Sequence, residues 1–307
     1  MKRIHMLGLI VVAGAVAAAV NVAAQQAAQG RQGGGPPGGD VGAIQKVAGQ
    51  VYFVPGAGGN TGVMVGANGV VLVDTKLANN GQAILDQVRS VTDRPVTHII
   101  NTHTHGDHTG SNQFFPTTVE IVTHANTQAN MQKMEVFQQE ANKHGLPDRT
   151  FTDRMTVLSG ADAIDLYHFG AAHTNGDAFV VFRNARVMHS GDAFANKGQP
   201  FIDRANGGSG VAYGETIGKA ASGIANVDTV IPGHSPTALP WQDLVDFGEF
   251  NRLMLSHARE SLKMGKTPEQ AMMDFKLPGK FSGYNLAGGR GGAAGNFGVL
   301  FEELKQQ

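Results

Sequence analysis

The sequence predicts a mixed α/β protein with more strands than helices. Short β-branched runs broken by Gly and Asn-Gly turns fill residues 41–74 and predict hairpins. Apolar residues at helical spacing over 79–90 predict a helix, and a buried strand is expected over 95–101. Together with the strands before residue 74, these segments give a strand, helix, strand order. Further strands are expected at 120–124, 154–158, 163–168, 178–182, 186–190 and 228–234, and helices at 125–143, 214–225 and 240–265.

The composition is that of a folded protein and excludes several kinds of site. The chain has 307 residues, of which 41% are hydrophobic. It contains no Cys, so disulfides, zinc fingers, iron–sulfur clusters and thiol nucleophiles are excluded, and a metal site must use His and carboxylates. Its 24 Lys and Arg balance 25 Asp and Glu, which argues against a nucleic-acid partner.

The N-terminus has the pattern of an export signal. Lys2 and Arg3 precede an apolar run over residues 7–20, and small residues follow at 22–24 where a signal peptidase would cut. The run is shorter than the roughly 20 residues needed to span a bilayer. We therefore expect residues 1–24 to be a removable signal peptide, leaving no stable membrane anchor and a periplasmic or secreted protein.

Composition also divides the rest of the chain. Residues 25–40 contain six Gly and two Pro with no large apolar side chain, which predicts a flexible linker. The folded core is expected over 41–239. Residues 240–307, a long helical pattern followed by a Gly-rich stretch, are expected to pack on this core as a C-terminal extension.

The densest cluster of ligand-type residues follows the strand that ends at Asn101. His103, His105, Asp107 and His108 lie within six residues. Residues two apart on an extended chain share a face, so the first two histidines can form one half-site. The turn at Gly106 can direct Asp107 and His108 toward a neighbouring position, so this one loop can reach two metal ions.

Three more candidates stand beside Gly residues or turns near the ends of predicted strands: His173, Asp192 and His234. Taken in order with the H-x-H-x-D-H run, they resemble the metallo-β-lactamase superfamily from Val41 to His234. The resemblance includes Asp74, which matches the family's strand-end aspartate. It implies an αβ/βα four-layer sandwich of two mixed sheets flanked by helices, with a metal site at one edge of the sheets.

The resemblance also implies how the ligands divide. His103, His105 and His173 would hold the first metal, Asp107, His108 and His234 the second, and Asp192 would bridge them. Nitrogen and carboxylate ligands suit two Zn²⁺ ions but also tolerate iron or manganese. The ligand histidines also need hydrogen-bond acceptors, for which Asp74, Thr102 and Thr104 are the candidates; the alternative for Asp74 is a strand-end cap. The remaining histidines are expected to be structural or surface residues: His98, His124, His144, His168, His189 and His257.

These features predict a binuclear zinc hydrolase that uses a metal-bound hydroxide on a small-molecule acyl substrate, an ester, thioester, lactone or amide. Asp107 would coordinate and orient the attacking water. A β-lactamase is the alternative within the class, although those enzymes usually carry Cys or Ser at the position of Asp192. A mononuclear iron enzyme of the persulfide dioxygenase kind and a metal-binding protein without turnover are the alternatives from other classes.

Substrate choice is expected to depend on the loops around the metal edge, which hold Phe, Met, Gly and Asn more than paired charges. These segments are 55–61, 125–143, 194–210 and the residues after His234. A neutral, partly apolar rim favours an uncharged or weakly anionic carbonyl compound over a phosphodiester.

Overall fold

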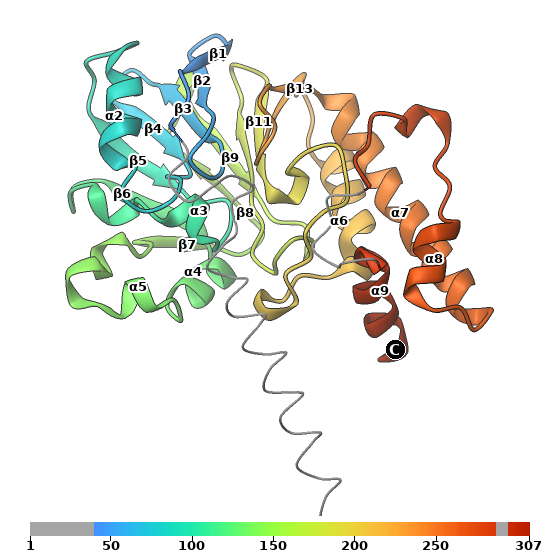
Figure 1. Cartoon of the computed structure of the whole chain (residues 1–307). Coiled ribbons are helices and arrows are strands. Elements are labelled where there is room, and N and C mark those ends of the chain that lie inside the picture. Colours follow the sequence, from blue (N-terminus) through green and yellow to red (C-terminus); the bar gives the residue numbers. More distant parts are fainter. Residues whose placement is uncertain (1–39, 287–293) are drawn as a thin grey trace, which may run out of the picture.

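Two β-sheets pack face to face and helices cover both outer faces in the computed structural model, which describes residues 40–286 and 294–307 (Figure 1). This is the four-layer αβ/βα sandwich that the resemblance implied. The predicted signal peptide and all but Asp40 of the predicted linker lie outside the described residues. Among residues 40–286 and 294–307, we find no helix with the length and hydropathy of a membrane span.

The N-terminal sheet has seven strands in sequential order. The first four form antiparallel hairpins, and the last four run parallel to one another. Its strands are β1 (Gln45–Ala48), β2 (Val51–Val54), β3 (Thr61–Val65), β4 (Val70–Val73), β5 (Val96–Ile100), β6 (Glu120–His124) and β7 (Arg149–Phe151).

The second sheet has six strands in the order β13-β12-β11-β10-β9-β8, and only β11 and β12 pair in parallel. Its strands are β8 (Arg154–Val157), β9 (Ile164–Tyr167), β10 (Phe179–Phe182), β11 (Val187–Gly191), β12 (Thr229–Pro232) and β13 (Leu239–Pro240).

Alternating side chains explain why the central strands are apolar throughout. In β4, Val71 and Val73 point into the core between the two sheets, whereas Val70 and Leu72 point toward α2 (Gly81–Arg89). In β10, Phe179 turns away from the inter-sheet core to the helices of the other outer layer. A strand buried on both faces loses the polar alternation of a half-exposed strand.

The C-terminal residues form a helical layer over the second sheet. The main helices are α6 (Gly210–Gly223) and α7 (Trp241–Lys263), which pack against each other, and α8 (Pro268–Asp274) and α9 (Asn296–Lys305) follow. Leu244, Phe247 and Phe250 of α7 are fully buried against this sheet, as the helical spacing predicts. The prediction of a Gly-rich stretch falls partly on 287–293, outside the described residues.

The predicted helix over 125–143 is broken. The chain forms α4 (Ala125–Met131), α5 (Glu135–Gln138) and a 3-10 turn over Glu140–Gly145, because Met134 and Gln139 adopt extended backbone angles. Met131 and Phe137 are still buried core residues, as predicted. The break leaves Met134 beside the predicted metal edge, where its Sδ accepts a hydrogen bond from Thr104 Oγ1 at 3.7 Å.

Candidate metal centre

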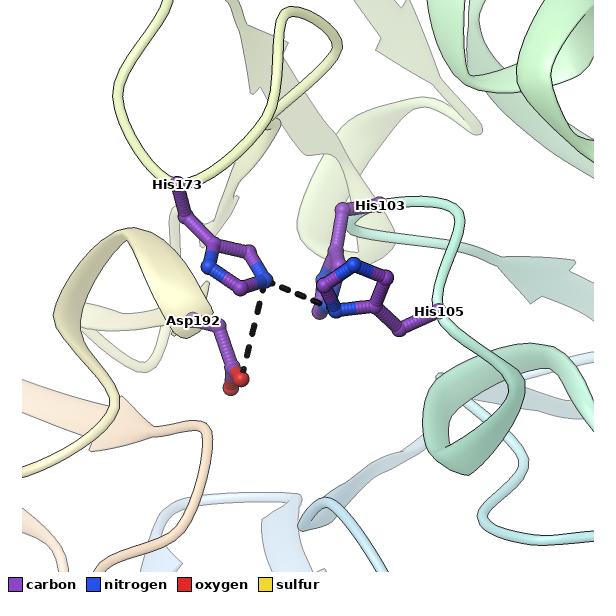
Figure 2. A group of neighbouring side chains, drawn as sticks. All are labelled: His103, His105, His173 and Asp192. Atoms are coloured by element: carbon purple, nitrogen blue, oxygen red, sulfur yellow. Dashed lines mark hydrogen bonds and ion pairs between the residues drawn. The ribbon is translucent and has the colours of Figure 1, made fainter. Parts of the chain in front are cut away.

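All seven predicted ligand residues meet at one edge of the sandwich. The loop after β5 and the short helix α3 (Gly106–Thr109) supply four of them, and the loops after β9, β11 and β12 supply His173, Asp192 and His234. Ligand atoms of His103, His105, His173 and Asp192 lie within 4.8 Å of one another, and so do those of Asp107, His108 and His234. Figure 2 shows the first group converging from three separate segments.

Two histidines of the first group face each other with unprotonated ring nitrogen atoms. His105 Nε2 lies 2.6 Å from Asp203 Oδ2, and His173 Nδ1 lies 2.7 Å from the Phe201 carbonyl oxygen. Both of these partners only accept, so each ring carries its proton on that side. His105 Nδ1 and His173 Nε2 therefore face each other at 2.9 Å with no proton between them, which is the arrangement of two ligands around one cation (Figure 2).

His103 reaches the same position through a relay that begins at Asp74. Thr102 Oγ1 donates to Asp74 Oδ2 at 2.7 Å, so it can only accept from His103 Nδ1, which lies 3.0 Å away. The other ring nitrogen, Nε2, is buried and has no hydrogen-bond partner. The first position thus holds three imidazole nitrogens whose lone pairs are free to bind a metal.

The second group is arranged around His108. Its Nδ1 lies 2.7 Å from Asp74 Oδ2, which directs Nε2 toward the second position, 3.3 Å from His234 Nε2. Asp107 Oδ2 lies 3.4 Å from His234 Nε2. The His234 side chain is 21% exposed, whereas those of Asp107 and His108 are buried, so the second position is the one open to solvent.

Asp192 lies between the two groups. Its Oδ2 is 3.8 Å from His173 Nε2 and 3.2 Å from His234 Nε2, and its Oδ1 is 3.3 Å from His108 Nε2. A carboxylate within reach of ligands from both groups has the placement expected of a bridging residue. Tyr213 fixes the backbone of Asp192, because its hydroxyl donates to the Asp192 carbonyl oxygen at 3.0 Å.

Buried polar atoms without partners show that the site fits a metal. Among the described residues, these include His103 Nε2, both carboxylate oxygens of Asp107 and Asp192 Oδ1. Leaving such atoms unpaired is costly unless a cation satisfies them. The backbone comes close as well: a Cβ at Gly233 would stand 1.9 Å from Asp192 Oδ1 and one at Gly59 2.2 Å from the His108 ring, so only glycine fits there.

The two groups differ in their electrostatics. Burial lowers the pKa values of His103, His105 and His173, which keeps these rings neutral. Burial acts on His108 and His234 too, but the nearby carboxylates, chiefly that of Asp192, overcome it and raise both pKa values. The Asp192 pKa is held well below its usual value, against burial, by His234 and His108.

Two of the three residues that were expected to contact the ligand histidines do so. Asp74 and Thr102 contact ligand histidines, whereas Thr104 bonds to Met134 and makes no hydrogen bond to a ligand ring. Sequence reasoning missed Asp203 and the Phe201 carbonyl, because neither stands at a strand end or at a spacing that marks a ligand. The nearest signal was the Asn-Gly-Gly turn that follows Asp203.

Lys76 is a second missed residue. It is fully buried, and its Nζ donates to the carbonyl oxygens of Val54 at the end of β2 and of Gly56 and Gly59 in the loop that follows, at 2.7, 2.7 and 3.0 Å. Burial lowers its pKa to about 7 despite the carboxylates of Asp74 and Asp107. This lysine fixes the loop that packs against Asp107 and His108.

In the part of the chain that the structure describes, six further histidines lie outside the groups of ligand atoms. His124 and His168 stack at 3.9 Å between ring centroids, and His189 lies 3.0 Å from the Asn60 carbonyl oxygen. His144 and His257 contact the carbonyl oxygens of Gln113 and Ala271, and His98 lies near Glu120.

The chain matches a known protein family in sequence. Residues 54–239 match the sequence profile of the metallo-beta-lactamase superfamily. The uncharacterized protein YobT of Bacillus subtilis (strain 168) is 30% identical over 141 residues, which cover 43% of this chain and 60% of YobT.

Solved structures agree in fold at low identity. The stereoselective inverting sec-alkylsulfatase Pisa1 from Pseudomonas sp. superposes with a TM-score of 0.72 and 13% identity, over 85% of this chain and 50% of that one. A metallo-beta-lactamase from Pontibacter korlensis gives a TM-score of 0.57 and 18% identity, over 69% and 99%. The chain thus spans only 50–60% of the length of YobT and of the sulfatase.

The profile match covers more than half of the chain, and the fold and the clustered His and Asp side chains agree with it. The chain belongs to the metallo-beta-lactamase superfamily, and it brings together His and Asp side chains that could hold a metal ion.

Proposed function

We propose that this chain is an exported binuclear zinc hydrolase that acts on a small acyl substrate, an ester, thioester, lactone or amide. The observation that carries the proposal is the pair of ligand groups that share Asp192. Seven donors exceed the three or four protein ligands that one tetrahedral zinc ion needs. The nitrogen and oxygen donors suit zinc first, and iron or manganese would also be accommodated.

Two zinc ions, when bound, polarise a carbonyl group and lower the pKa of water so that hydrolysis needs no protein nucleophile. The residues of the chain supply position and charge. Asp107, whose two oxygens have no hydrogen-bond partner, orients the attacking water. Asp192 places negative charge between the two positions, and the partly exposed His234 marks the side from which substrate enters.

The rim supports a neutral or weakly anionic substrate. Lys197 and Arg204, the basic residues of the segment 194–210, are paired with Asp243 at 2.8 Å and Glu303 at 3.0 Å. Phe201 lies 5.9 Å from His105 and 5.6 Å from His173, measured between ring centroids, and presents an apolar face. A phosphodiester would need unpaired Arg or Lys side chains here.

A substrate panel with zinc-loaded protein tests the acyl assignment. Lactones, thioesters, aryl esters, β-lactams, phosphodiesters and a secondary alkyl sulfate should be compared between wild type and Asp107→Asn, with the exposed Asp93→Asn as a matched control. We expect turnover of an acyl substrate that Asp107→Asn abolishes and Asp93→Asn retains. Dominant turnover of the phosphodiester or the alkyl sulfate would refute the proposal.

The two enzyme alternatives predict different results. A β-lactamase would hydrolyse a chromogenic cephalosporin faster than any ester, whereas the presence of Asp192 predicts weak β-lactam turnover. An iron dioxygenase of the persulfide kind would contain about one iron per chain and consume oxygen with a persulfide substrate. Metal analysis, together with oxygen consumption measured with an electrode, therefore distinguishes the iron dioxygenase from the hydrolase.

Export is the part of the proposal that rests on sequence alone. N-terminal sequencing of the protein purified from a cell envelope fraction should begin near residue 25 if the signal peptide is removed. Full-length protein confined to the cytoplasm would contradict export and leave the hydrolase assignment standing.

A further inference from the structure

The segment 200–209 hydrogen-bonds to two of the three histidines of the first metal position. Asp203 Oδ2 accepts from His105 Nε2 at 2.6 Å, and the Phe201 carbonyl accepts from His173 Nδ1 at 2.7 Å. The segment also holds the backbone of the second histidine, since Asp203 N donates to the His173 carbonyl at 2.9 Å. Both imidazoles therefore owe their orientation to one short loop.

Helix α9 at the C-terminus holds this segment at both ends. At one end Asn296 Nδ2 donates to the Pro200 carbonyl at 2.7 Å. At the other end the Glu303 carboxylate accepts from Ser209 Oγ at 2.8 Å and from Gly210 N at 2.9 Å. Figure 1 shows α9, at the red end of the chain, beside α6, which begins where the segment ends.

These contacts are shielded from water. Asp203, Asn296 and Glu303 are all buried, and Phe297, Leu300 and Phe301 anchor α9 in the apolar cluster under α6 and α7. The fit is close, because a Cβ at Gly210 would stand 2.9 Å from Leu300 Cδ2. Buried hydrogen bonds to a carboxylate are strong, so a change in α9 is transmitted to the segment rather than absorbed by solvent.

The second position lacks this support. Within the described residues, no hydrogen bond or ion pair joins α9 to Asp107, His108 or His234; these contact Asp74, Asp192 and one another. The C-terminal helix is thus connected to one half of the site only.

We propose that Asp203 is a positioning residue for His105 and that α9, through Glu303 and Asn296, sets the metal affinity of the first position without changing that of the second. The inference rests on the proposed function only in requiring that a metal bind at His103, His105 and His173. Partners that orient a ligand imidazole typically change metal affinity by about 10–100-fold.

Stepwise metal affinities test the inference. Zn²⁺ affinity would be measured by competition with a chromophoric chelator, and Co²⁺ spectra would assign each step to a position. We expect Asp203→Asn to weaken the first position by about 10–100-fold. Glu303→Gln should weaken it several-fold, and neither change should alter the second position. The exposed neighbour substitution Glu302→Gln is the matched control and should leave both affinities unchanged.

The double variant Asp203→Asn/Glu303→Gln separates positioning from general stability. If Glu303 acts through this segment, the combined loss of affinity is smaller than the two single losses multiplied together. A Glu303→Gln protein that melts at lower temperature but binds both metals as the wild type does would overturn the inference. If that variant does not fold, Asn296→Ala at the other end of the segment provides the same measurement.

Failure of the two proposals can be told apart. Wild-type protein that binds no metal at the three histidines would refute the proposed function and this inference with it. Wild-type binding with equal first-position affinity in Asp203→Asn would refute the inference alone.

Discussion

The two halves of the metal site are held in different ways. In the first position each histidine ring is fixed by its own acceptor: Thr102, Asp203 or the Phe201 carbonyl. In the second position only His108 has such a partner, Asp74, while both oxygens of Asp107 make no hydrogen bond and His234 is partly exposed.

This difference in support indicates that the two metal positions have different roles. The first position is buried, neutral and preorganised, which is what tight retention of a metal requires. The second is surrounded by carboxylates that raise the pKa values of its histidines, and it opens to solvent. We expect the first to retain its metal and the second to face the substrate.

The largest effect is expected at Asp192, the residue shared by both halves. Asp192→Asn keeps the shape but removes the negative charge between the two positions, so hydrolysis should fall by about 100-fold or more and both metal affinities should decrease. The fold should survive, as circular dichroism would show. Full activity with both metals retained in Asp192→Asn would disprove the bridging role.

Asp74 offers the next test, because it fixes histidines in both halves. Asp74→Asn should weaken both positions by about 10–100-fold, since His108 contacts Asp74 directly and His103 through Thr102. Thr102→Val breaks only the path to His103 and should weaken the first position alone. Stepwise metal titration of the two variants checks this, and an equal loss at both positions in Thr102→Val would show that the relay is wrong.

The smallest effect is a pH dependence in the loop that carries His173. Asp177 is buried and accepts from Thr174 N and Oγ1, and burial raises its pKa from 3.8 to about 6. Because the folded-state pKa is raised, the folded state favours the protonated acid, and wild-type stability decreases as the pH rises from about 4 through 6. Asp177→Asn, which cannot ionise, should gain roughly 2 kcal/mol relative to wild type between pH 4 and pH 7.5.

Denaturant unfolding of the metal-free proteins at the two pH values measures this difference. The exposed Asp93→Asn should show no comparable change. A stability difference between Asp177→Asn and wild type that does not vary with pH would mean that folding does not raise the pKa of Asp177.

Much of the fold was predictable because the periodicity was clear. The strand over 120–124 matches β6, and the helical pattern over 240–265 matches α7 to within two residues at each end. The helix over 125–143 was wrong at its centre, because the Met131, Met134 and Phe137 spacing fits one continuous helix as well as two short ones. Local spacing does not reveal a break that packing imposes.

The site was predictable only as far as residue type and strand ends allow. The seven ligand candidates stand after strands or beside Gly, so the sequence indicated them, and the structure brings them together. Asp203 and Glu303 could not be found in this way, because they act from a loop and a C-terminal helix that are distant from the H-x-H-x-D-H run. α9 itself was not predicted, since the Gly-rich stretch before it hides its short apolar pattern.

Metal stoichiometry tests the central claim most directly. Wild-type protein, His103→Ala and His108→Ala would be equilibrated with Zn²⁺ by dialysis and analysed by inductively coupled plasma mass spectrometry. We predict two zinc ions per chain in the wild type, loss of the first in His103→Ala and loss of the second in His108→Ala. One metal per chain in the wild type and no loss in His108→Ala would contradict the two-position site.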